Sequence, residues 1–171
     1  MKYITIILIL LIASTSFALD NDYFSVYLPN QPELREFNAQ LGGFGRAHLF
    51  EYQSSYKAEN IDISYNISVL QFLDETNLIK FTDKAILDIL LRGYSEDHLK
   101  LVDLKEIKQG NATGIRFVFW DMRKHARITR LAFSYRPYLW VIRVTSNKNN
   151  PQSRDLARKI INSFKIQIPS K

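Results

Sequence analysis

Three arginines in the second half of the chain have the residue types and spacing best suited to binding chemistry. Arg116, Arg130 and Arg143 each lie in an apolar or aromatic run with the period-two pattern of a β-strand. Trp120 follows four residues after the first of them. A guanidinium presents several N–H donors in a fixed fork, so arginines at one depth beside a Trp surface could grip a carboxylate, a phosphate or an acidic protein. We therefore expect a basic and aromatic sheet face that binds an anionic partner.

A second interpretation of these arginines stays open. A helix would cover the face, and each guanidinium would pair with an Asp or a Glu, because arginine stems cover apolar surface well. A second cationic cluster falls in the polar segment after Trp120 and comprises Arg123, Lys124, His125 and Arg127. It is a candidate binding patch, and a solvated turn is the competing interpretation.

Period two also predicts which side chains share a sheet face. We expect one face to carry Ile115, Phe117 and Phe119 with Leu131, Phe133 and Tyr135 and with Trp140, Ile142 and Val144. The opposite face would carry Arg116, Val118 and Trp120 with Arg130 and Ala132 and with Leu139, Val141 and Arg143. An alternative function follows from the first set. An apolar pocket between sheet and helices, lined by Phe117, Phe133 and Trp140, would make the protein a small-ligand carrier.

Catalytic and metal chemistry find no support in the sequence. The chain contains no Cys and has three His, namely His48, His98 and His125, without the close ligand pairing typical of metal sites. No Gly-x-Ser-x-Gly elbow is present, and the acidic pairs Asp74-Glu75 and Glu96-Asp97 are neighbours in loop-like sequence. We predict no enzyme activity, no catalytic residue, no metal and no cofactor.

The N-terminus has the pattern of an export signal. Lys2 precedes an apolar run from Ile4 to Ala13, and Ser16-Phe17-Ala18 forms a small-x-small cleavage site. The run is about half the length of a membrane-spanning helix, which needs about 20 residues. We expect residues 1–18 to be a signal peptide cleaved after Ala18, residues 19–171 to form a single domain without a transmembrane anchor, and the protein to work in the periplasm or outside the cell.

The charge balance favours anionic partners. Lys and Arg number 23 against 17 Asp and Glu, a formal net charge of +6. No nucleic-acid recognition motif is present, and export argues against a nucleic-acid partner. The expected partner is another envelope or secreted macromolecule, with acidic ones favoured.

The order of elements predicts an α+β fold, an antiparallel sheet of about six to seven strands flanked by helices. Strands are expected at Tyr23–Leu28, Arg46–Tyr52, Ile61–Leu70, Leu99–Lys108, Ile115–Trp120, Arg127–Tyr135, Tyr138–Thr145 and Lys165–Ile168. Residues 30–32 and 53–60 are expected to be loops. One amphipathic helix is expected at Asp83–Arg92, and another after the Asn150-Pro151 cap.

This pattern resembles exported bacterial proteins of the PsbP-like fold, the fold of the extrinsic P subunit of photosystem II. A Ran-binding nuclear import factor is similar in fold. The residues that carry the resemblance, spread between Tyr23 and Ile168, are Phe24-Ser25-Val26-Tyr27-Leu28-Pro29 with Pro32, Gly110, Gly114, Arg130, Trp140-Val141-Ile142-Arg143-Val144 and Asn162-Ser163-Phe164. The resemblance implies an α/β/α sandwich with helices on both sheet faces and a non-enzymatic role in binding or assembly. It transfers no catalytic residue.

Overall fold

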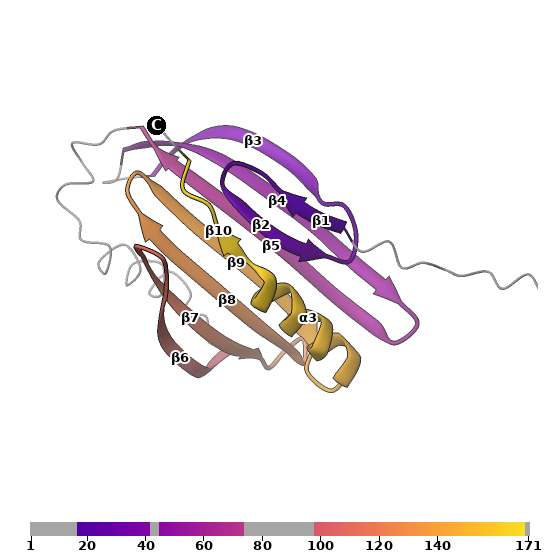
Figure 1. Ribbon diagram of the computed structural model, residues 1–171. Helices are drawn as coiled ribbons and strands as arrows, with labels where there is room; N and C mark the ends of the chain where they lie inside the picture. The colour runs from indigo at the N-terminus through magenta and orange to yellow at the C-terminus, as the bar shows by residue number, and fades with distance from the viewer. Residues whose placement is uncertain (1–16, 42–44, 74–97, 170–171) are drawn as a thin grey trace, which may run out of the picture.

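The computed structural model describes residues 17–41, 45–73 and 98–169. Seven strands form one antiparallel sheet in the order β3-β4-β5-β9-β8-β7-β6 (Figure 1). Their bounds are β3 Glu33–Gln40, β4 Arg46–Ala58, β5 Ile61–Phe72, β6 Leu99–Gln109, β7 Ala112–Asp121, β8 Ala126–Tyr135 and β9 Tyr138–Asn147. A smaller antiparallel sheet has the order β1-β2-β10, with β1 Phe17–Asp20, β2 Phe24–Leu28 and β10 Lys165–Ile166. The helix α3 spans Pro151–Ser163.

Strand β5 shows why these segments pair as they do. Its odd-numbered residues from Ile63 to Val69 are apolar or aromatic and buried, whereas the intervening residues are Ser and Asn. A side chain points to alternate faces along a strand, so this alternation gives the sheet one packed face and one polar face.

The helix α3 begins where the sequence predicts it. The Asn150 side chain accepts a hydrogen bond from the backbone N–H of Ser153 at 2.9 Å, and Pro151 occupies the first helical position. This cap satisfies one of the backbone donors left free at a helix start. Ala157, Ile160 and Ile161 are buried on the side that meets the sheet.

One face of the large sheet, here called the α3 face, packs against α3 and β2. It carries Tyr65, Trp140 and Phe133, which belong to the same buried cluster as Phe24 of β2 and Phe164 after α3. In Figure 1, α3 and the β1-β2 hairpin lie on the same side of the large sheet. The indole N–H of Trp140 donates to the backbone carbonyl of Tyr23 at 2.8 Å, which ties the two sheets together.

The other face, here called the far face, has two different halves. One half carries a second buried apolar cluster that includes Phe117, Phe119, Ile128 and Leu139, and this cluster extends to Ala47 of β4 and Phe72 of β5. In the other half, between residues 51 and 55 of β4 and between residues 64 and 68 of β5, the side chains on this face are polar and partly exposed. Within the described part of the chain, no helix is long and apolar enough to cross a membrane.

The structure confirms the α+β class, a mainly antiparallel sheet with a flanking helix, and seven strands in the main sheet. The expected helix at Asp83–Arg92 lies outside the described residues. The loop expected at residues 30–32 is confirmed, because these residues lie between β2 and β3. The loop expected at 53–60 is wrong in most of its length: residues 53–58 continue β4, and the hairpin turns at Glu59-Asn60. The edge strand β3 at residues 33–40 was not predicted. Residues 53–58 are polar because they line an open face, and polarity alone suggested a loop.

Candidate functional site

A hollow of about 980 Å³ lies on the far face over β4, β5, β8 and β9. We call it the face groove. Hydroxyl and amide side chains make up most of its lining, and they include Gln31, Gln53, Ser55, Ser64, Asn66, Ser68 and Thr145. Two acids, Glu33 and Glu51, and two arginines, Arg130 and Arg143, also line it. Such a surface can exchange many hydrogen bonds with a partner, and this is how polar contacts fix the orientation of a bound molecule.

The strand registers place a single row of side chains along the middle of this groove. Residues directly opposite on neighbouring antiparallel strands share a face, with Cβ atoms about 4.5–5.5 Å apart. The pairings run in order through Glu33, Gln53, Asn66, Arg143, Arg130 and Phe117. The row passes from an acidic edge strand through amides to two arginines and ends in the apolar half of the far face.

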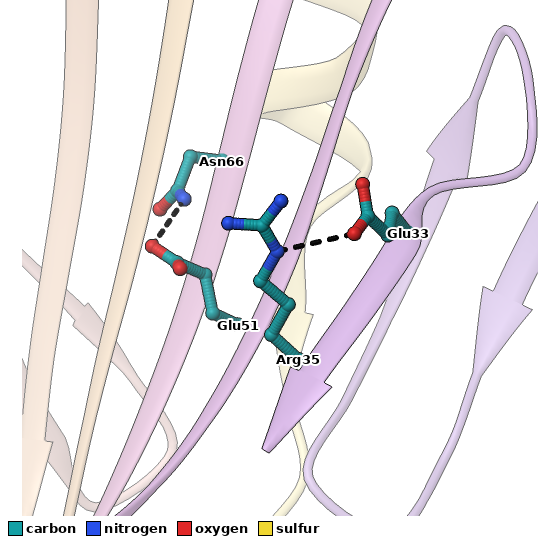
Figure 2. Close-up of polar contacts among 4 residues, drawn as sticks. All are labelled: Glu33, Arg35, Glu51 and Asn66. Carbon is teal, nitrogen blue, oxygen red and sulfur yellow. Dashed lines mark hydrogen bonds and ion pairs between the residues drawn. The ribbon is translucent and has the colours of Figure 1, made fainter. Parts of the chain in front are cut away.

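Both acids of the groove have partners on the sheet itself. Glu33 Oε1 accepts from Arg35 Nε at 3.1 Å, and Glu51 Oε1 accepts from the Asn66 amide at 2.7 Å (Figure 2). With the Gln53 amide oriented so that its oxygen faces Arg35, that oxygen accepts from the guanidinium Nη2 at 3.0 Å. These contacts leave the acids less available to an incoming partner.

The two arginines of the groove differ in their surroundings. Arg130 on β8 is 4% exposed, and Arg143 lies directly opposite it on β9 with an exposed side chain. Among the described residues, the Arg143 side chain makes no hydrogen bond or ion pair. An exposed guanidinium on a concave polar surface is available to a carboxylate or a phosphate.

The predicted grouping of the three arginines on one face is wrong. Arg116 pairs with Leu131 across β7 and β8, whereas Arg130 pairs with Phe117. Arg116 and Trp120 therefore lie on the α3 face, and Arg130 and Arg143 lie on the far face. Arg116 also has an acidic partner, since its Nη2 lies 2.6 Å from Asp103 Oδ2.

The expected apolar pocket is also not formed by the three residues named for it. Phe117 lies on the far face, and Phe133 and Trp140 lie on the α3 face. All three are fully packed in the two buried clusters. They contribute to the core on opposite sides of the sheet and do not share a cavity.

The basic cluster forms the turn between β7 and β8. Arg123, Lys124 and His125 are exposed, and Arg127 is half-buried at the start of β8 on the α3 face. Asp121 Oδ1 accepts from the backbone N–H groups of Arg123 at 3.0 Å and of Lys124 at 2.9 Å. Burial would raise the Asp121 pKa, but these hydrogen bonds, helped by the nearby charges of His98 and Lys124, bring the pKa below its usual value.

No group of three or more His, Asp or Glu side chains in the described residues is arranged to hold a metal ion. His48 is hydrogen-bonded to one acid and one amide. Its Nε2 lies 2.7 Å from Glu36 Oε1, and its Nδ1 lies 2.9 Å from Asn38 Oδ1 on the edge strand.

Comparison with known proteins gives a likeness in fold. No family model and no curated protein match the chain. A solved structure from Pseudomonas aeruginosa, PA94, described as a protein of unknown function with a suggested role as a regulator, superposes with a TM-score of 0.50 at 10% identity. The match covers 80% of this chain and 99% of that one. At this identity the likeness concerns the fold alone.

Several groove residues were not among the predicted site residues. Gln53 and Ser55 lie in a segment expected to be a loop, and Glu33 lies in a segment for which no element was predicted. Glu51 and Asn66 lie in expected strands without being assigned a role. A signal was present for Asn66 and its neighbours. The uniform Ser and Asn positions between the apolar residues of β5 mark a strand face that is polar but not charged.

Proposed function

We propose that this protein is an exported, non-catalytic binding protein that receives an acidic macromolecule in the face groove. Arg143 carries the proposal: it is an exposed guanidinium in the groove with no partner among the described residues, beside acids that are already hydrogen-bonded. The open shape and the many hydroxyl and amide groups suit a large partner surface more than a small buried ligand.

Two further points belong to this proposal. We assign the chain to the PsbP-like fold, whose second helical layer would cover the apolar half of the far face. We also propose export through the N-terminal signal. The Ala18–Leu19 bond lies within β1, which pairs with β2 from Phe17 to Asp20. Cleavage there would leave Leu19 and Asp20 in place to pair with Val26 and Ser25.

Charge reversal in the groove tests the proposed function. The mature chain from Leu19 is used to capture partners from an envelope extract, and captured macromolecules are quantified by mass spectrometry at low and high salt. We expect a partner that Arg143→Glu no longer captures and that high salt releases, because exposed ion pairs are screened. Lys165→Glu, an equal charge change on the exposed side of β10, is the matched control and retains capture. Equal capture by wild type and Arg143→Glu would refute the assignment of the groove.

A further inference from the structure

A second cavity lies on the opposite side of the sheet and is strongly cationic. Its volume is about 310 Å³, and it sits between α3 and strands β7 and β8. Four arginines line it: Arg116 from β7, Arg127 from β8, and Arg154 and Arg158 from α3. We call it the arginine pocket. Its volume is at the lower end of the range of ligand pockets, about 300–1,000 Å³.

The arrangement of the four cations is unfavourable without a ligand. Arg154 and Arg158 are four residues apart on α3, and like charges at this spacing repel. Arg116 and Arg127 approach from the sheet on the same face. A packed protein gains nothing from four converging guanidiniums unless anions offset their charge.

The acids of the described residues offset only part of this charge. Arg116 pairs with Asp103 at 2.6 Å, and Arg158 pairs with Asp155 at 3.4 Å. The side chains of Arg127 and Arg154 make no hydrogen bond or ion pair within the described ranges. In addition, Arg116 Nε is buried without a hydrogen-bond partner, and such a buried donor is costly when left unsatisfied.

We propose that the arginine pocket binds a small soluble molecule through a phosphoryl or diphosphoryl group. Phosphoryl oxygens point in several directions and carry most of two negative charges per group, so guanidiniums on the sheet side and the helix side can bind them together. A carboxylate offers two oxygens in one plane and suits this two-sided arrangement less well. Thr129 and Asn162 in the same lining supply neutral hydrogen-bonding groups for the rest of the molecule.

Inorganic pyrophosphate is a direct probe of this site. Isothermal titration of the full mature domain at low salt is expected to show one binding site. Arg127→Ala and Arg154→Ala should each weaken binding about tenfold or more, as expected for a lost charge-assisted hydrogen bond. Arg123→Ala, in the exposed turn outside the pocket, is the control and keeps the wild-type affinity. Because Arg154 is exposed on the helix, its replacement leaves the core intact, and a pyrophosphate-dependent rise in Tm gives a second readout.

Two further experiments test whether the pocket binds other polyanions or lipid headgroups instead of a soluble phosphoryl compound. Citrate at the same concentration tests whether any compact polyanion is sufficient, and equal affinity for citrate would overturn the phosphoryl assignment. Vesicles of phosphatidylcholine containing phosphatidylglycerol test a lipid headgroup as the source. Vesicle binding that depends on Arg154, without pyrophosphate binding, would overturn the small-molecule proposal. Pyrophosphate binding that is unchanged in Arg127→Ala and Arg154→Ala would also overturn it.

Discussion

Arg130 and Arg143 lie directly opposite each other on β8 and β9, one buried and one exposed, on the same face of the sheet. Two like charges in a cross-strand pair repel, and such pairs destabilise a sheet. The arrangement places a cationic pair at the point where the polar groove meets the apolar half of the far face. The proposed binding role of the groove would account for a pair of this kind being kept at some cost to stability.

Removal of the exposed arginine should not destabilise the protein. We expect Arg143→Ala to raise the free energy of unfolding slightly, by about 0.2–1 kcal/mol at low salt, because the repulsion from Arg130 is relieved. Urea denaturation at low and high ionic strength measures the effect, and added salt should reduce it. Arg123→Ala in the exposed turn serves as the control. A clear loss of stability in Arg143→Ala would show that this side chain has a structural role.

The tie between the two sheets gives a second prediction. Trp140 is fully buried, and its indole donates to the Tyr23 carbonyl. Trp140→Phe should lower the free energy of unfolding by about 2–3 kcal/mol, through a lost hydrogen bond and a smaller ring in the core. Trp120→Phe is the matched change at a residue 37% exposed and should stay within about 0.5 kcal/mol of wild type. Unfolding of each variant in urea is measured by far-ultraviolet circular dichroism. An equal loss of stability in Trp140→Phe and Trp120→Phe would contradict the burial assigned to Trp140.

Gly114 is required because Phe133 packs directly on its Cα. A Cβ at this position would lie 2.4 Å from Phe133 Cδ1 and 2.8 Å from the Ala132 carbonyl oxygen. Gly114→Ala should therefore destabilise the protein by about 1–3 kcal/mol. In a Phe133→Leu background the same change should cost less, so a double-mutant cycle should show coupling between the two positions. Simple additivity would mean that the two residues do not meet as described.

Gly110 provides the comparison for this prediction. It has a φ of +56° in the turn between β6 and β7, and nothing lies within 4 Å of an added Cβ. Gly110→Asn should be nearly neutral, since Asn tolerates this left-handed conformation. Gly114 is thus required because a side chain would clash there, whereas Gly110 is favoured by its backbone conformation alone.

The lowered pKa of Asp121 leads to a prediction about the stability of the protein at acid pH. Its folded pKa is below the value of about 3.9 expected for an unfolded chain. The stability it contributes is therefore fully present above the unfolded pKa and is lost as the pH falls through the folded pKa. The difference in unfolding free energy between wild type and Asp121→Asn should shrink as the pH is lowered from 6 toward 3 in urea titrations. A difference that stays constant over this range would contradict the lowered pKa.

The sequence predicted most of the strands and the cap of α3, because both depend on local patterns. The buried alternation of β5 and the Asn150-Pro151 start of α3 are visible without tertiary information. Strand β3 was not predicted because it is an edge strand whose side chains are mostly exposed on both faces. Its Glu and Arg residues carry no periodic apolar signal.

The face assignment of β7 failed for a different reason. Phe117, Val118 and Phe119 are all buried, so alternation along β7 does not reveal which face is which. The length of the turn from Met122 to His125 decides which side chains of β7 and β8 share a face. Because Asp121 pairs with Ala126 across four turn residues, even-numbered residues of β7 pair with odd-numbered residues of β8. Arg116 therefore shares a face with Leu131 and α3, and it joins the arginine pocket instead of the groove.

The candidate sites depend on contacts that the sequence does not show. Arg154 and Arg158 are visible as a pair four residues apart on a helix, but their approach to Arg116 and Arg127 follows from how α3 packs across the sheet. The polar residues of the face groove were assigned to loops or left without a role because one strand face stays open.

Site-specific photocrosslinking tests the central claim most directly. A photoreactive amino acid replaces Ser64, an exposed groove residue, or Gln152, an exposed residue on α3, and each mature protein is irradiated in an envelope extract. We predict that position 64 forms a crosslink to a macromolecular partner, that position 152 does not, and that Arg143→Glu abolishes the crosslink. A partner joined at position 152 and not at position 64 would contradict the assignment of the face groove as the binding surface.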